Sequence, residues 1–238
     1  MPLPDAVAAA RRAGFDAVEC HFPYDTPPAD LAAAGLPVIS LNTPPGDRAA
    51  GEFGLAAVPG RIAAARAGIA QAVDYAVAAG AGAVHVMAGY SQGAAGAEDT
   101  FRANLAHACD LAAPQGLTVL IEPLNPHDAP GYHLASLDHA LSIIAAVGRA
   151  NLRLMYDCYH IARIHGDVGA AFARTRDVVG HVQFAGVPDR GEPDTGTVDY
   201  RTLLPALRWH GPFGAEYRPR GGDTLAGLGW LGAFRALA

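Results

Sequence analysis

The sequence is poor in cysteine. Its three cysteines, Cys20, Cys109 and Cys158, are widely spaced, odd in number and contain no CxxC pair. This pattern argues against a disulfide framework and against a cysteine-ligated zinc site, and it predicts a reducing, cytoplasmic location. Cys158 follows Asp157 directly, and we interpret it as a small buried hydrophobic residue rather than as a reactive thiol.

The sequence also lacks positive charge in excess and long apolar runs. Its net charge of −6 argues against a nucleic-acid-binding protein, since such proteins usually carry a basic face. A small anionic substrate held by one or two arginines stays compatible with this charge. No apolar run reaches the length of a transmembrane helix, so no membrane partner is expected. The oligomeric state is left open, a homo-oligomer included.

What the chain does have is a regular alternation of strand-like and helix-like segments. Its 238 residues, 51% of them hydrophobic, suit one α/β barrel or one large doubly wound domain. Strands are predicted near residues 15–20, 36–41, 83–87, 118–122, 152–157, 178–184 and 213–217. The intervening helical segments indicate a parallel sheet with crossover helices. Without a linker or a repeat, residues 1–238 are predicted to form a single domain.

The number of strands is one short of a closed barrel. A (β/α) barrel needs eight strands, and this chain opens with a helical segment at Leu3–Ala13. We therefore predict an α/β TIM-type barrel that lacks its first β-strand. The strands at 15–20 and 213–217 then pair with each other, or the tail or a partner covers the gap, or the true start codon lies upstream. We favour the upstream start, because apolar barrel interiors rarely tolerate an open seam.

Four predicted strands run directly into a side chain that carries an oxygen donor. These side chains are Glu122, Asp157, Gln183 and Glu216. Because parallel strands place their carboxyl ends at one end of a barrel, we expect the four to share a site. Helix capping is the alternative for each carboxylate. Oxygen donors of this kind favour a hard or borderline divalent cation, Mg²⁺ or Mn²⁺.

Glu122 and Glu216 are also the candidate acid–base pair. Two carboxylates on either side of a metal ion can move a proton between adjacent carbons, while the metal polarises a carbonyl and stabilises an enediolate. The alternative is that both glutamates are only metal ligands. Whether the metal is essential is left open.

Two histidines are candidates for contacts with substrate oxygens. His160 stands three residues after Asp157, and His85 lies within the strand predicted at 83–87. The alternatives are a histidine at the start of a helix for His160 and a satisfied core histidine for His85.

Two long loops carry further candidates. In the loop at 185–197, Arg190 suits a substrate carboxylate through its planar guanidinium, and Glu192 is placed to orient Arg190 or a substrate hydroxyl. Solvated loop charges are the alternative. Glu52 lies in the loop at 43–60, which is too long for a plain connector and is therefore predicted to be functional.

Several stretches together resemble the hydroxypyruvate isomerase family, within the xylose isomerase-like TIM barrels. They span nearly the whole chain in order: FDAVECHFPY (15–24), NTPPGD (42–47), AGEFG (50–54), PGR (59–61), HVMAG (85–89), IEPLN (121–125), PGYHL (130–134), YDCYH (156–160), GHVQ (180–183), DRGEPDTG (189–196) and EYRP (216–219). The resemblance implies a metal site at Glu122, Asp157, Gln183 and Glu216, with the two glutamates as the catalytic pair. It implies interconversion of hydroxypyruvate and tartronate semialdehyde, or action on a related 2-oxo-tetronate. Family members begin with a strand before the helix that matches Leu3–Ala13.

Three other functions compete with the isomerase. Ketose 3-epimerases look similar but usually have histidine where this chain has Gln183, which favours the isomerase. A nuclease of the endonuclease-IV type shares the fold, but the acidic charge and the shortage of clustered histidines count against it. A truncated relative that binds ligand without turnover is supported only by the missing first strand.

Overall fold

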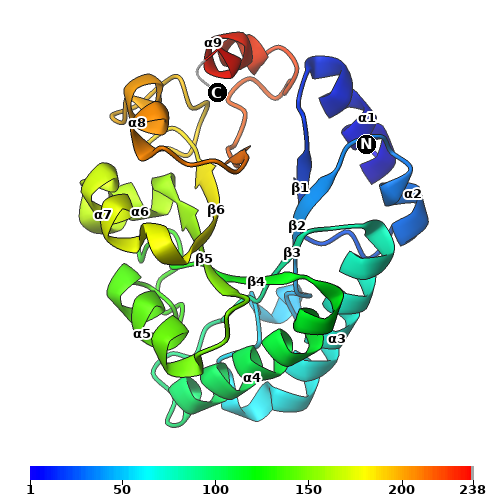
Figure 1. The fold of residues 1–238 in the computed structure, drawn as a ribbon, viewed down its shortest axis with the longest axis vertical. Coiled ribbons are helices and arrows are strands. Elements are labelled where there is room, and N and C mark those ends of the chain that lie inside the picture. The colour runs from blue at the N-terminus through cyan, green and yellow to red at the C-terminus, as the bar shows by residue number, and fades with distance from the viewer. Residues whose placement is uncertain (237–238) are drawn as a thin grey trace. The chain divides into compact units, whose positions relative to one another are not determined.

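The structure is a computed structural model that describes residues 1–236, in which strands and helices alternate along the chain (Figure 1). The strands are β1 (Val18–Cys20), β2 (Val38–Asn42), β3 (Ala83–His85), β4 (Thr118–Ile121), β5 (Leu152–Asp157), β6 (Val179–Phe184) and β7 (Phe213–Ala215). The helices are α1 (Leu3–Ala13), α2 (Pro28–Ala32), α3 (Ile62–Ala79), α4 (Ala97–Ala112), α5 (Leu137–Val147), α6 (Cys158–His165), α7 (Val168–Thr175), α8 (Tyr200–Leu207) and α9 (Leu231–Arg235). Seven strands among the described residues fit the predicted TIM-type barrel lacking one strand.

The described residues form two compact units, 1–154 and 155–236, and the division falls within β5. In the first unit, β1 to β5 pair in parallel in the order of the sequence. The prediction of a parallel sheet is therefore confirmed for these strands. The β3–β4 register sets His85 beside Leu120, two residues before Glu122.

The second unit pairs β6 with β7, also in parallel. Gln183 of β6 lies beside Gly214 of β7, and Phe184 lies beside Ala215. The backbone N–H of Glu216 donates to the carbonyl of Phe184 at 3.2 Å, which continues the pairing one residue beyond β7. Both Gln183 and Glu216 are thus fixed by the same strand pair.

The strands that end in site residues are buried, as the apolar runs predicted. In β4, Val119, Leu120 and Ile121 have no exposed surface. A strand buried on both faces is typical of a parallel sheet covered by helices. Strands β1, β3 and β7 have three residues each and are shorter than predicted, because the remaining residues of each predicted range lie in turns and loops.

The long loop at 43–60 is a built structure rather than a plain connector. It contains two 3₁₀ turns, Arg48–Ala50 and Pro59–Arg61. Gly54, at φ +103°, forms an isolated antiparallel bridge with Ala88 just after β3. A Cβ atom on Gly54 would lie 2.7 Å from the carbonyl oxygen of Met87, so only glycine allows this approach. The loop is thereby attached to the end of β3.

The structure has a helix, α6, at Cys158–His165, where a helix was expected only as the alternative explanation of Asp157 and His160. It begins directly after β5 because Asp157 caps it, accepting a hydrogen bond from the backbone N–H of Tyr159 at 2.8 Å. An aspartate that ends a strand and begins a helix leaves no loop residues to mark the boundary.

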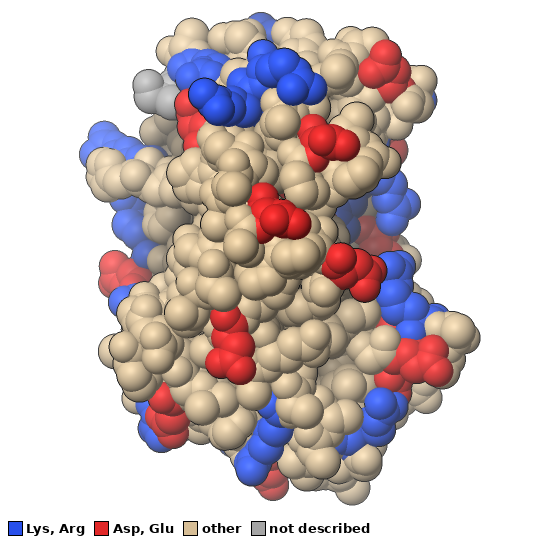
Figure 2. All heavy atoms as spheres, turned by 90° about the vertical axis from the view of Figure 1, so that its right-hand side faces the viewer, with Lys and Arg blue, Asp and Glu red and all other residues tan. Residues whose placement is uncertain are grey.

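Charged side chains are dispersed on the face shown in Figure 2, singly or in small groups among uncharged ones. The side chains coloured as Lys or Arg are all arginines, because the chain contains no lysine. Among the described residues, no helix is long and apolar enough to cross a membrane.

Candidate active site

In the first unit, Glu122 lies at the end of β4 beside His85, the last residue of β3. Oε2 of Glu122 is 3.9 Å from Nδ1 of His85, and both side chains are buried. The nearest following helix, α5, is capped by Ser136, whose hydroxyl accepts from the backbone N–H of His139. Glu122 is therefore not a helix cap, which removes that alternative for this residue.

Burial and the charge of Glu122 act on a neighbouring phenol. Burial raises the pKa of Tyr132, and the negative charge of Glu122 raises it further. The Tyr132 oxygen accepts a hydrogen bond from the backbone N–H of Ala88 at 2.9 Å. Tyr132 thus stays protonated at neutral pH and is a neutral neighbour of Glu122.

In the second unit, Asp157 uses its two carboxylate oxygens for different purposes. Oδ1 caps α6, while Oδ2 lies 3.4 Å from Nη2 of Arg190 and 3.7 Å from Nε2 of His160. The helix-cap alternative is therefore correct for Asp157, but it accounts for only one oxygen. The other oxygen lies near the guanidinium of Arg190 and the imidazole of His160, both of which were predicted to contact substrate.

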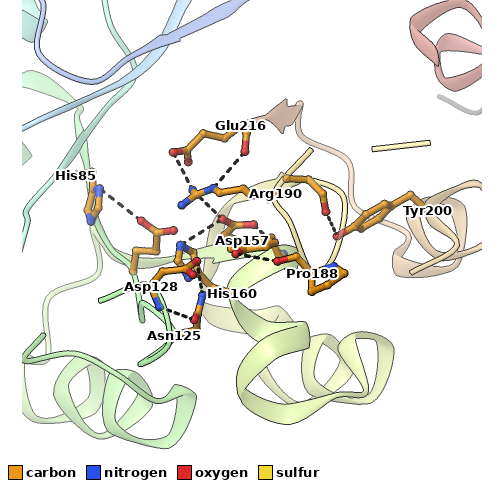
Figure 3. Close-up of polar contacts among 12 residues, drawn as sticks. His85, Asn125, Asp128, Asp157, His160, Pro188, Arg190, Tyr200 and Glu216 are labelled. Carbon is orange, nitrogen blue, oxygen red and sulfur yellow. Dashed lines mark hydrogen bonds and ion pairs between the residues drawn. The ribbon is translucent and has the colours of Figure 1, made fainter. Parts of the chain in front are cut away.

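Arg190 joins Asp157 to Glu216 (Figure 3). Its Nη2 atom lies 2.8 Å from Oε1 of Glu216 as well as 3.4 Å from Asp157, and its guanidinium stacks 5.1 Å from the centre of the Tyr159 ring. Arg190 was predicted to bind substrate. In the structure it contacts Asp157 and Glu216, which were both predicted to bind a metal ion. His160, in the first turn of α6, is buried in the same unit.

The predicted metal ligands in the second unit carry the types of donor atom that a hard divalent cation prefers. Asp157, Gln183 and Glu216 supply carboxylate and amide oxygens, the ligands that Mg²⁺ and Mn²⁺ prefer. Asp157 and Glu216 both lie next to the Arg190 guanidinium, so one positively charged group already contacts both carboxylates. Gln183 is buried within β6.

Glu52 is engaged within its own loop. Its carboxylate forms a close ion pair with Arg61 and accepts a hydrogen bond from the backbone N–H of Asp47 at 2.6 Å. These contacts hold the loop at 43–60 in shape. Glu52 therefore has partners within the protein, Arg61 and the backbone of Asp47, that do not involve a ligand.

Glu192 contacts Arg220 rather than Arg190. The backbone N–H of Arg220 donates to its Oε1 at 3.0 Å, and Nε of Arg220 lies 3.6 Å from its Oε2. The hydrogen bond from the Arg220 backbone lowers the pKa of Glu192. These contacts do not support the prediction that Glu192 orients Arg190. The arginine that Glu192 contacts depends on the position of the segment after β7, which carries Arg220.

The three cysteines are free and buried. Burial raises the pKa of the Cys20 thiol to about 11 and that of the Cys109 thiol to about 12. Burial and the neighbouring Asp157 charge raise the pKa of Cys158 well above its usual value. Since the thiolate is the reactive form, the burial of Cys158 and its raised pKa favour the interpretation as a small buried hydrophobic residue.

One group of polar residues in the first unit was not predicted from the sequence. Glu98, His133 and His139 meet there, although they lie in three separate segments. No spacing in the sequence marks the group, because its members are up to 41 residues apart.

Comparison with known proteins identifies close relatives. A 2-oxo-tetronate isomerase from Cupriavidus necator is 47% identical over 237 residues, which cover 95% of this chain and 91% of that protein. A hydroxypyruvate isomerase from Escherichia coli is 37% identical and covers 95% of this chain and 91% of its own length. These relatives support an isomerase activity.

Solved structures and family models agree on the fold. A crystal structure from Brucella melitensis titled AP endonuclease, family 2, superposes with a TM-score of 0.94 at 37% identity and covers 98% of this chain and 94% of that chain. The family described as xylose isomerase-like TIM barrel matches residues 7–234. The parallel strands, the polar side chains at their carboxyl ends and these similarities lead to one conclusion: the chain belongs to the xylose isomerase-like TIM barrel family.

Proposed function

We propose that this protein interconverts hydroxypyruvate and tartronate semialdehyde, or the corresponding 2-oxo- and 3-oxo-tetronates. Relatives of this chain carry names for both activities, at 37% and 47% identity over nearly the whole chain. Both reactions move a carbonyl group between adjacent carbons of a small anionic hydroxy-oxo acid. The contact that carries the proposal is the ion pair of Arg190 with Glu216, next to Asp157.

The proposed chemistry is a proton transfer between neighbouring carbons. In hydroxypyruvate, one glutamate removes a proton from C3, and the electron pair of that C–H bond forms the C2=C3 bond of an enediolate. A proton then returns to C2, while O3 loses its proton and becomes the aldehyde oxygen and O2 gains one. We assign these transfers to Glu122 and Glu216, the glutamates that follow β4 and β7, because carboxylates act as general acids and bases.

The proposal gives the other residues binding roles. A divalent cation bound by Glu122, Asp157, Gln183 and Glu216, most simply Mg²⁺ or Mn²⁺, would stabilise negative charge on the enediolate oxygens. Arg190 binds the substrate carboxylate, and His160 and His85 hydrogen-bond to substrate oxygens. Glu52 and Glu192 act through the loops that they hold in place.

The experiment is a proton NMR assay of the purified protein with hydroxypyruvate and, separately, with a 2-oxo-tetronate. Each substrate is followed with Mg²⁺, with Mn²⁺ and after exhaustive chelation. We expect isomerisation of at least one substrate, with activity restored by one of the two metals. Parallel assays with ketohexoses test the 3-epimerase alternative. Epimerisation of a ketose without isomerisation of either acid would refute the proposal, and full activity after chelation would remove the metal from it.

A further inference from the structure

Glu98, His133 and His139 form a compact cluster in the first unit. Glu98 lies in the first turn of α4, His133 in the segment between β4 and α5, and His139 in the first turn of α5. Oε2 of Glu98 is 2.8 Å from Nε2 of His139 and 3.2 Å from Nε2 of His133. Each of the three side chains thus offers one ligand atom, and these atoms lie within 4.8 Å of one another.

Neighbouring groups hold the cluster in this arrangement. The second ring nitrogen of His133, Nδ1, lies 2.9 Å from the Ser91 hydroxyl, and the His133 ring packs edge-on against Phe101. The other oxygen of Glu98 pairs with Arg102 at 2.6 Å, so only Oε2 faces the histidines. Histidines that bind metals usually have their second nitrogen occupied by a hydrogen-bond partner, because that contact fixes the ring and its tautomer.

The two contacts of Glu98 are near the separation that ligand atoms of a small tetrahedral ion have. With zinc–ligand bonds of roughly 2.0–2.1 Å, neighbouring ligand atoms in a tetrahedron lie about 3.3 Å apart. The two observed separations of 2.8 and 3.2 Å are close to this value. Two imidazoles and one carboxylate form a borderline donor set that suits zinc better than magnesium or calcium.

Access is also available. The exposed fractions of the side chains are 10% for His133, 29% for His139 and 34% for Glu98. The cluster is therefore open enough for an ion to enter and for water to complete the coordination, but His133 is too enclosed to be a plain surface side chain.

We infer that Glu98, His133 and His139 form a binding site for one zinc ion, separate from the oxygen-donor residues at the strand ends. A bound zinc ion joins α4 to the segment that follows Glu122 and to the start of α5. The site therefore stabilises the connection between β4 and α5. The inference does not depend on the proposed isomerase reaction, and its test does not measure turnover.

The test is a zinc titration of the chelator-treated full-length protein, followed by calorimetry and thermal unfolding. Saturating Mg²⁺ is present throughout to compete for oxygen-donor sites. We expect one saturable zinc equivalent and a rise in the unfolding temperature. His139→Gln and Glu98→Gln should each weaken zinc binding more than about 100-fold, and Ser91→Ala about 10- to 100-fold, since Ser91 acts only through the His133 ring.

His107→Gln is the matched control, because His107 lies on the same helix as Glu98 but outside the cluster. It should bind zinc like the unchanged protein. Anomalous diffraction at the zinc edge then locates the ion. Zinc binding that His139→Gln leaves unchanged, a peak away from these three side chains, or no saturable binding would overturn the inference. In that case the cluster is a carboxylate hydrogen-bonded to two histidines and nothing more. Circular dichroism of each variant confirms that it is folded, and the two ligand variants test the site independently.

Discussion

Nη2 of Arg190 lies 2.8 Å from Oε1 of Glu216, within one compact unit of the chain. The same nitrogen lies 3.4 Å from Asp157. Arg190, which was predicted to bind substrate, therefore forms ion pairs with two residues that were predicted to bind a metal ion. Arg190 can therefore have two roles. It can bind the substrate carboxylate, which would affect KM, or it can position Asp157 and Glu216, which would affect kcat.

Arg190→Lys separates these roles. Lysine replaces a planar fork by a point charge. If Arg190 holds the substrate carboxylate, KM should rise about tenfold with kcat retained, which corresponds to ~1.4 kcal/mol for a lost charge-assisted hydrogen bond. If it positions Asp157 and Glu216, kcat should fall with KM unchanged. The control is Arg163→Lys, because Arg163 also packs on the Tyr159 ring but donates to the Pro188 carbonyl instead. Unchanged kinetics in Arg190→Lys would exclude both roles.

Glu122→Gln and Glu216→Gln test the acid–base pair. Each change removes a titratable carboxylate and keeps its shape, so the fold should survive. We expect a loss of roughly 10²–10⁴ in the rate of solvent-deuterium exchange into the substrate, as for the loss of a general acid or base. Proton NMR in deuterated buffer measures the exchange. Asp110→Asn is the control, since Asp110 lies on α4 and pairs with Arg149 on the surface. Near-normal exchange in either glutamine variant would remove that residue from the pair.

Gly54→Ala should destabilise the protein through the loop at 43–60. The added Cβ atom would lie 2.7 Å from the Met87 carbonyl oxygen, at a φ of +103°. Strain and crowding together are expected to cost about 2–4 kcal/mol in the free energy of unfolding. Gly51→Ala is the matched control, because Gly51 has φ +81° but nothing within 4 Å of its Cβ position. It should show the strain alone, about 1–2 kcal/mol. Urea denaturation measures both, and equal losses would show that the close approach to Met87 carries no cost.

Asp199 should make the stability of α8 depend on pH. Its carboxylate accepts from the Thr202 hydroxyl at 2.7 Å and from the backbone N–H of Arg201 at 3.1 Å, and the Thr202 hydrogen bond is the main cause that lowers its pKa. A carboxylate whose pKa is lower in the folded state than in the unfolded state stabilises the fold at pH values above its unfolded-state pKa. This stabilisation is lost as the pH falls through its folded-state pKa. Asp199→Ala should therefore lower the unfolding temperature at pH 7, and the difference from the unchanged protein should shrink in acid. A difference that stays constant with pH would contradict this assignment.

The sequence by itself determined the alternation of strands and helices and the polar residues at the strand ends. Buried strands such as β4 are encoded by continuous apolar residues, and β5 and α1 have the predicted bounds. These features are local, because a strand or helix follows from the pattern of its own residues. The sequence indicated α6 only through the alternatives of a helix cap at Asp157 and a helix start at His160, since Asp157 both ends a strand and caps a helix.

Only the tertiary structure decided which charged groups meet. Glu192 contacts Arg220, 28 residues away, rather than Arg190. Glu98 meets His133 and His139, which are 35 and 41 residues away, so two histidines that are not adjacent in the sequence form a cluster in the fold. Such pairings depend on how loops and helix ends pack against the sheet, and no periodic pattern along the chain records the direction in which a loop side chain finally points.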